Sequence, residues 1–277
     1  MPIASTEQLE RSFLEEYNSN HAILKYSSQT AGHGVSYLIE HEYAAAYDQA
    51  IEICRRTSSQ PLRLLEFGCG AGMNVIGLLA RLARRSIPIK DAFGTDFAES
   101  LIESARREAR ASLPSALREK LSFHVASNER LSMELATATG TSPEALFGSF
   151  DFIFGVNTFR YCHRLSTERD CADDVFRLLR RGGTCVMIDM NDRFPLFRSH
   201  LKRTVESSAA TYLPSLEEYT EPFRQSGFEI LAKRHFSWIP HSAGPSLTRV
   251  CRMLTPILNV TVPSRAMRSL VIAKKPL

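Results

Sequence analysis

The chain has 277 residues, 44% of them hydrophobic and 23% charged, which is ordinary for a globular protein and excludes a disordered chain, a collagen or a disulfide-rich miniprotein. This length holds one large or two small domains with a buried core. The 34 basic and 30 acidic side chains leave a formal charge of +4, and the arginines stand in pairs rather than in a long run, so nucleic acid is not an expected partner.

The first part of the chain has a helical pattern. Apolar side chains in residues 7–30 recur every three or four positions, which is typical of an amphipathic helix. Glycines at 32 and 34 interrupt the pattern, and it resumes over residues 37–56 before Pro61. We expect residues 1–58 to form a helical cap or lid, ahead of a main domain that spans residues 59–277.

From residue 62 onward, short apolar runs alternate with amphipathic helical patterns. The expected strands are 62–67, 92–96, 121–125, 150–155, 184–189, 228–233 and 269–274. The expected helices are 74–85, 99–110 and 169–181, and the last of these should end at Gly182-Gly183. This alternation predicts an α/β fold with a mostly parallel sheet covered by helices on both faces.

Two connections are long enough to count as insertions. They cover about 191–214 and 238–268, and the second contains Pro240, Pro245, Pro256 and Pro263. Connections of this length usually carry function or a subdomain.

The six cysteines lie far apart, and the closest two, Cys162 and Cys171, are nine positions apart, which is poor zinc-ligand spacing. We expect free thiols in a reducing compartment. No signal-peptide core and no membrane-spanning apolar run occurs in the sequence. The expected location is the cytoplasm.

A glycine-rich turn follows the first strand. Gly68, Gly70 and Gly72 lie between a strand and a helix, where open α/β sheets bind ligands against the main chain. The spacing is G-x-G-x-G, and not the G-x-G-x-x-G of dinucleotide folds. Glu66 stands two positions before the first glycine, where it favours a cationic ligand over an anionic pyrophosphate.

Asp96 ends the second strand, 24 positions after Gly72. A carboxylate at this place can accept hydrogen bonds from both hydroxyls of a ribose. Phe97 follows and offers an apolar face for a purine ring.

With these motifs in order, the chain resembles the class I S-adenosylmethionine-dependent methyltransferases. The matching segments are 66–72, 94–98, 123–131, 150–157 and 178–183. The resemblance covers about residues 60–235 and the strand near 269–274. It implies a Rossmann-like seven-stranded sheet whose antiparallel last strand is inserted between the fifth and the sixth. It also implies S-adenosylmethionine as cofactor and S-adenosylhomocysteine as product.

The resemblance also implies roles for single residues. Glu66 and the loop of Gly68, Cys69, Gly70 and Gly72 would hold the methionine end, Asp96 the ribose and Phe97 the adenine. Ser127 and Asn128 stand where members of the family often have an acid near the adenine amino group. Gly155 and Asn157 would lie beside the reacting methyl group.

A general base for the acceptor is sought among the residues after the fourth strand. Tyr161 and His163 are candidates, and His33 is another because family members often fold an N-terminal segment over the methyl donor. The alternative is that His163 and His33 are solvated helix-start and loop residues. His235 and His241 could line an acceptor pocket or serve no such role.

Polar residues after the fifth strand, Asp189, Asn191 and Asp192, could hold a divalent cation, but such a set is common in simple loops, and we expect no metal. Phe194, Leu196 and Phe197 could cover an apolar acceptor or pack in the core.

The sequence thus predicts an enzyme that methylates an O, N or C nucleophile of a small molecule. A nucleic-acid or protein methyltransferase is the alternative, although residues 157–160 lack the Asn/Asp-Pro-Pro-aromatic signature of base methylation. A non-catalytic module that binds the methyl donor is a further alternative, and a dehydrogenase is the most remote.

Overall fold

The structure, a computed structural model, describes residues 15, 33–195 and 213–277. The expected helix over 7–30 and most of the expected insertion at 191–214, with Leu196 and Phe197, lie outside the described residues.

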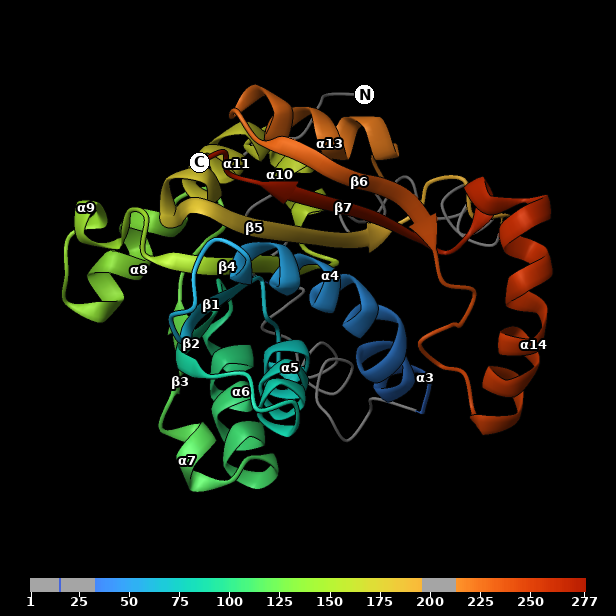
Figure 1. Cartoon of the computed structure of the whole chain (residues 1–277), viewed down its shortest axis with the longest axis horizontal. Helices are drawn as coiled ribbons and strands as arrows, with labels where there is room; N and C mark the ends of the chain where they lie inside the picture. Colours follow the sequence, from blue (N-terminus) through green and yellow to red (C-terminus); the bar gives the residue numbers. More distant parts are fainter. Residues whose placement is uncertain (1–14, 16–32, 196–212) are drawn as a thin grey trace.

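One mixed sheet forms the centre of the described part of the chain (Figure 1). Its seven strands have the order β3-β2-β1-β4-β5-β7-β6. They are β1 (Leu62–Phe67), β2 (Ile89–Asp96), β3 (Leu121–Val125), β4 (Phe150–Val156), β5 (Leu179–Met190), β6 (Glu229–Phe236) and β7 (Arg268–Lys274). Strands β1 to β5 pair in parallel, and β7 is antiparallel to both β5 and β6. The predicted Rossmann-like topology is confirmed, and the strand order reverses between β1 and β4, where open sheets bind ligands.

Helices cover both faces of the sheet, as predicted. One face carries the π-helix η1 (Leu38–Tyr43), α4 (Ala44–Arg55), α5 (Met73–Arg84) and α6 (Glu99–Ser112). The other carries α8 (Leu131–Thr139), α10 (Phe159–Leu165), α11 (Glu168–Leu178) and α13 (Leu216–Gln225). The remaining helices are α3 (His33–Tyr37), α7 (Ser115–Arg118), α9 (Pro143–Leu146), α14 (Pro245–Thr261) and the short 3-10 helix η3 (Pro263–Arg265). None of the described helices is long and apolar enough to cross a membrane.

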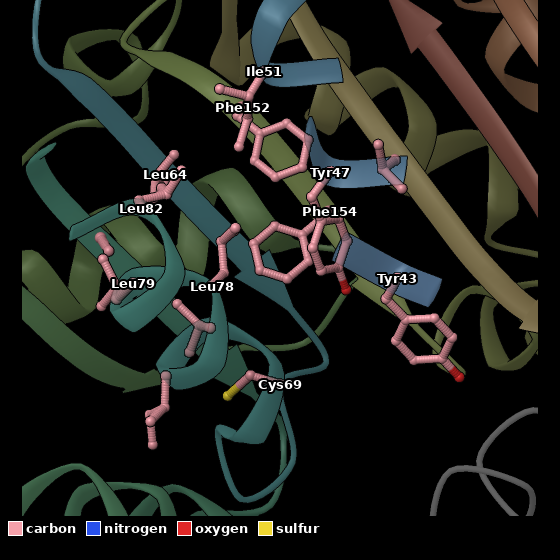
Figure 2. Close-up of a cluster of buried hydrophobic side chains, with 14 of the residues drawn as sticks. Tyr43, Tyr47, Ile51, Leu64, Cys69, Leu78, Leu79, Leu82, Phe152 and Phe154 are labelled. Atoms are coloured by element: carbon pink, nitrogen blue, oxygen red, sulfur yellow. The ribbon is translucent and has the colours of Figure 1, made fainter. Parts of the chain in front are cut away.

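Aromatic packing fixes α4 on the sheet beside the reversal point. The Tyr47 ring lies 6.0 Å from that of Phe152 and 5.0 Å from that of Phe154, both on β4 (Figure 2). Ile51 continues the same helix face one turn later and is fully buried. Because burying large apolar side chains stabilises a fold by about 1.5–3 kcal/mol each, α4 is firmly held, and so is Tyr43 one turn before Tyr47.

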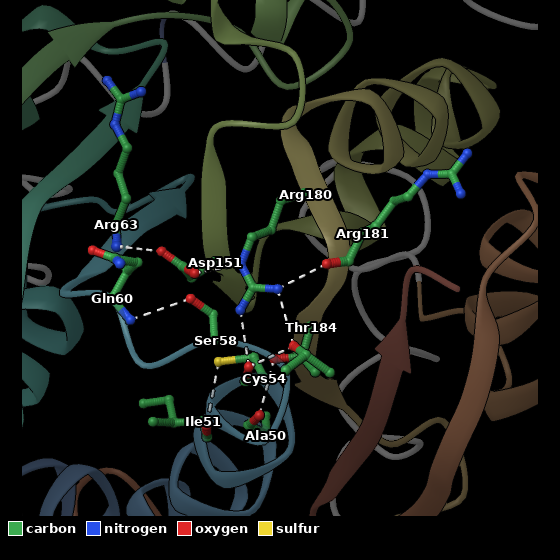
Figure 3. Close-up of polar contacts among 11 residues, drawn as sticks. Ala50, Ile51, Cys54, Ser58, Gln60, Arg63, Asp151, Arg180, Arg181 and Thr184 are labelled. Carbon is green, nitrogen blue, oxygen red and sulfur yellow. Dashed lines mark hydrogen bonds and ion pairs between the residues drawn. The ribbon is translucent and has the colours of Figure 1, made fainter. Parts of the chain in front are cut away.

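Polar contacts tie the other end of α4 to the sheet (Figure 3). Arg180 on β5 donates from Nε to Asp151 Oδ1 over 2.5 Å, from Nη1 to Thr57 Oγ1 over 3.0 Å and from Nη2 to Cys54 O over 2.9 Å. The second oxygen of Asp151 accepts the backbone N–H of Arg63 over 2.8 Å. A single guanidinium therefore joins the C-terminal end of α4 to the first residues of β4 and β5.

The predicted end of one helix was wrong. Helix α11 ends at Leu178, because Leu179 has extended backbone angles (φ −69°, ψ 138°) and starts β5. Gly182, which was expected to cap the helix, instead donates its backbone N–H to Lys275 O over 2.9 Å. The glycine pair thus lies in an irregular stretch of strand.

The proline-rich segment 238–268, expected as an insertion, contains the helix α14. Pro256 lies inside the 17-residue helix α14 and does not end it, while Pro245 occupies its first turn. Proline suits a first turn because that position needs no hydrogen-bonded N–H.

Candidate functional site

A cavity of about 590 Å³ lies at the carboxyl ends of the parallel strands. The segments that follow β1, β2, β3 and β4 form one side of it. The opposite wall is formed by Val35, Ile39 and Tyr43 from α3 and η1 and by His241 and Ser242 from the loop before α14. A volume of this size is typical of pockets for small molecules and cofactors.

The glycine turn after β1 lines the cavity with main-chain atoms. Gly68 and Gly70 have left-handed backbones, with φ +60° and +54°. A Cβ at Gly68 would lie 1.9 Å from Thr158 Oγ1, whereas a Cβ at Gly70 would meet no atom within 4 Å. Gly68 is therefore needed by the packing of the protein, and Gly70 leaves open space on the cavity side.

Asp96 joins this turn to the end of β2. Its Oδ2 accepts the N–H of Gly70 over 2.9 Å, and its Oδ1 accepts the N–H of Ala98 over 3.0 Å. Burial raises the pKa of the Asp96 carboxyl to about 6, although the backbone N–H groups act in the opposite direction. Asp96 and Phe97 both line the cavity.

Glu66 is not among the residues that line the cavity. Its side chain is fully buried, and its Oε2 accepts the N–H of Val75 in the first turn of α5 over 2.9 Å. Burial raises the pKa of Glu66 well above its usual range. In this structure Glu66 caps the N-terminus of α5, where N–H groups without partners inside the helix favour a carboxyl group.

Two of the expected glycines also lie outside the lining. Gly72 is the N-cap of α5. A Cβ at Gly155 would lie 2.8 Å from the Phe67 ring and 2.9 Å from Thr158 Cγ2, so that this glycine serves the packing behind the cavity.

The segment after β3 contributes two polar side chains. Ser127 donates its N–H to Glu134 Oε2 over 2.7 Å, and its Oγ is buried with no hydrogen-bond partner among the described residues. Asn128 donates from Nδ2 to Thr158 Oγ1 over 2.8 Å. Both residues line the cavity, as do Cys69 and Asn157.

Of the three candidate bases, the structure brings Tyr161 to the cavity. Its hydroxyl accepts a hydrogen bond from Arg160 Nη2 over 2.8 Å, and the guanidinium lies 4.8 Å from the ring centre. His163 lies outside the lining, 5.1 Å from the Phe159 ring and 5.4 Å from that of Tyr219, and burial lowers its pKa to about 4. His33 is exposed and also lies outside the lining.

The opposite wall contains residues that the sequence reasoning missed. Val35, Ile39 and Tyr43 are spaced by four positions, and this helical spacing was the available signal. Tyr43 Oη lies 3.4 Å from Nε2 of His241, one of the two histidines suggested for an acceptor pocket. The other, His235, lies outside the lining and contacts Ser269 Oγ over 3.3 Å.

Asp189 and Asn191, at and after the end of β5, form hydrogen bonds with backbone groups. Asp189 accepts the N–H groups of Arg160 and Met190 over 3.2 and 2.8 Å, and Asn191 donates to Ser264 O and Ala266 O over 2.9 and 2.6 Å. In the described part of the chain, no three His, Cys, Asp or Glu side chains are grouped as metal ligands.

A family model described as a methyltransferase domain matches residues 58–238. A non-reducing polyketide synthase from Penicillium shearii is 27% identical over 147 residues, which are 53% of this chain and 6% of that protein. The chain thus spans only a small fraction of that synthase.

Two solved structures show how far the fold is shared. The [4+2]-cyclase SpnF has a TM-score of 0.58 and 15% identity, with 100% of this chain and 99% of that chain covered. Phosphoethanolamine N-methyltransferase 2 of Haemonchus contortus, solved with S-adenosyl-L-methionine, has a TM-score of 0.55 and 15% identity, with 99% and 61% covered. The matched family covers more than half of the chain and agrees with the glycine turn and the strand order. The chain belongs to the methyltransferase domain family and has the fold of the class I S-adenosylmethionine-dependent methyltransferases.

Proposed function

We propose that this domain transfers the methyl group of S-adenosylmethionine to an O, N or C nucleophile of a small molecule. The observation that carries the proposal is the two-sided cavity of about 590 Å³. One side consists of the strand ends with the glycine turn, and the other is the wall of Val35, Ile39 and Tyr43. These three residues lie within residues 1–58, the segment that we propose as a cap, and His241 and Ser242 complete the wall.

The residues on the strand side suit the methyl donor. Gly70 leaves room where a side chain would stand, Asp96 offers a carboxyl group, and Ser127 Oγ is buried without a partner among the described residues. We assign Asp96 to the ribose, Phe97, Ser127 and Asn128 to the adenine, and the turn of Gly68, Cys69 and Gly70 with Asn157 to the methionine end.

S-adenosylmethionine held by these residues would supply a methyl group bonded to a positively charged sulfur, with S-adenosylhomocysteine as the leaving group. The remaining contribution of this chain is to hold the acceptor in line and to exclude water. Positioning of this kind can contribute roughly 7–11 kcal/mol in favourable cases. Val35 and Ile39 are apolar groups placed to exclude water from the cavity.

A small acceptor is supported by the size of the cavity and by the modest formal charge of +4. A polymer would need a broad open surface, and a nucleic acid a basic one. We further propose a reducing, cytoplasmic location, which suits six cysteines that are all free thiols.

The test uses methyl-tritiated S-adenosylmethionine and a cell extract, separated afterwards into acid-soluble, nucleic-acid and protein fractions. We expect label in the acid-soluble fraction, and Asp96→Ala should abolish it while weakening S-adenosylhomocysteine binding in calorimetry. Label in nucleic acid or protein would replace the small acceptor by a polymer. Tight S-adenosylhomocysteine binding with no label in any fraction would favour a non-catalytic module.

A further inference from the structure

The wall opposite the glycine turn contains a pair of groups that can move a proton. Tyr43 ends η1 and His241 lies in the loop between β6 and α14, and both line the cavity. Oη of Tyr43 and Nε2 of His241 are 3.4 Å apart. We propose that Tyr43 and His241 together remove the proton that the acceptor loses on methylation, a role that rests on the proposed function.

The step balances as a relay of two protons. The acceptor's proton passes to Tyr43 Oη while the phenolic proton of Tyr43 passes to His241 Nε2, and the imidazolium then releases one proton to water. The acceptor's electron pair would form the new bond to the methyl carbon, while the carbon–sulfur bond of the donor would break with its electron pair on the sulfur of S-adenosylhomocysteine. Tyr43 is the group that touches the acceptor, and His241 acts through it. Proton removal of this kind typically contributes about 10²–10⁴-fold to a rate.

The two side chains are held on a common framework. A Cβ on Gly34 of α3 would lie 2.4 Å from Pro240 O and 2.8 Å from His241 O, so this helix and the His241 loop touch without an intervening side chain. The Tyr43 ring also packs edge-on against Phe236 at 6.0 Å. In Figure 2 Tyr43 stands apart from the packing of Tyr47 on Phe154. Both partners are therefore fixed relative to the cavity.

A buried positive charge lies behind Tyr43. Arg268 on β7 is 1% exposed, and its Nη1 donates to Asn157 Oδ1 over 3.3 Å. Its Nε is buried and has no hydrogen-bond partner among the described residues. Burial raises the pKa of Tyr43, Arg268 lowers it, and Glu42 and Asp189 raise it. The guanidinium therefore reduces the cost of negative charge on the phenol oxygen during the relay.

Tyr161, the other tyrosine that lines the cavity, has a different hydrogen-bond partner. Its hydroxyl accepts from the Arg160 guanidinium, a group that has only N–H donors and cannot take a proton away. The hydroxyl of Tyr43 instead lies beside the imidazole of His241, which can accept a proton.

The experiment compares five variants in the acid-soluble assay: Tyr43→Phe, His241→Ala, Tyr161→Phe and two controls. With the extract highly diluted to one fixed concentration, the acceptor lies far below its KM, and with saturating methyl donor the initial rate is proportional to kcat/KM. The unknown acceptor concentration then cancels between variants. We expect Tyr43→Phe and His241→Ala to lower the rate by about 10²-fold or more, with S-adenosylhomocysteine affinity and melting temperature unchanged. Added imidazole should restore His241→Ala and leave Tyr43→Phe inactive, because a merely structural role of His241 would not respond to free imidazole.

The matched controls are Tyr47→Phe, one turn further along, and His41→Ala on the exposed side of η1, neither of which lines the cavity. Both should keep the wild-type rate. Wild-type rates in Tyr43→Phe and His241→Ala, a loss confined to Tyr161→Phe, or no rescue by imidazole would overturn the relay and leave the proposed function standing. A wild-type protein that labels no small molecule would instead remove the proposed function and the relay with it.

Discussion

Gly68 and Gly70 offer a test of what each glycine of the turn is for, because their backbones are alike and their surroundings are not. Replacing either by alanine places a Cβ on a left-handed backbone, which costs about 1–2 kcal/mol. At Gly68 the new Cβ would also lie 1.9 Å from Thr158 Oγ1 and 2.5 Å from Thr158 Cβ. Overpacking of this kind typically costs a further 1–3 kcal/mol, roughly.

We therefore expect Gly68→Ala to lower the free energy of unfolding by about 2–5 kcal/mol, and Gly70→Ala by about 1–2 kcal/mol. The order reverses for ligand binding, because the Cβ at Gly70 enters open cavity space. Gly70→Ala should weaken S-adenosylhomocysteine about tenfold or more, which corresponds to about 1.4 kcal/mol. Urea denaturation followed by circular dichroism measures the first effect, and titration calorimetry the second.

The Gly68→Ala/Thr158→Gly double variant separates the steric part from the backbone part. Removing the threonine side chain should recover about 1–3 kcal/mol of the Gly68→Ala loss in a double-mutant cycle. The reasoning fails if Gly68→Ala is no less stable than Gly70→Ala, or if the cycle shows no coupling between positions 68 and 158.

Three further predictions follow from single contacts. The pKa of Asp96 is raised to about 6, so calorimetry should find S-adenosylhomocysteine binding weaker below pH 6. Because the folded state binds this proton more tightly than the unfolded chain, the same protonation adds stability as the pH falls, and the loss of affinity is not unfolding. Asp96→Asn should bind about 10–100-fold more weakly above pH 6 without that pH dependence, and a flat wild-type curve would contradict the assignment. Arg180→Ala leaves the buried Asp151 without its cation and should cost about 2–4 kcal/mol in urea denaturation; a cost near zero would show that the contact does not stabilise the fold. Cys251 is half-buried and the other five cysteines are buried, so an aromatic disulfide reagent should modify the Cys251 thiol first, and Cys251→Ser should lose this rapid phase; an unchanged rapid phase in Cys251→Ser would contradict the packing.

The fold was predictable because its signals are local. Each strand is a short apolar run, and the turn around Gly68 and Gly70 sits where a strand gives way to a helix. The parallel order and the inserted antiparallel β7 followed from the resemblance to a known family, and pairing confirmed them.

One wrong helix end and one missed contact have the same cause, a partner that is distant in sequence. Gly182 looks like a helix cap from its neighbours alone, but its N–H bonds to Lys275, 93 positions later. Glu66 accepts the N–H of Val75, nine positions later, and its expected role in holding the methyl donor stays a prediction. Tyr43 meets His241 across 198 positions, and no local pattern connects them.

The two sides of the cavity are encoded in different parts of the chain. The strand side comes from the continuous stretch 68–165, whereas the other wall is drawn from 35–43 and from 241–242. Random mutagenesis confined to Val35, Ile39 and Ser242 would therefore vary one half of the pocket and leave the other as it is. Such a separation lets related enzymes change their acceptor while they keep the same methyl donor.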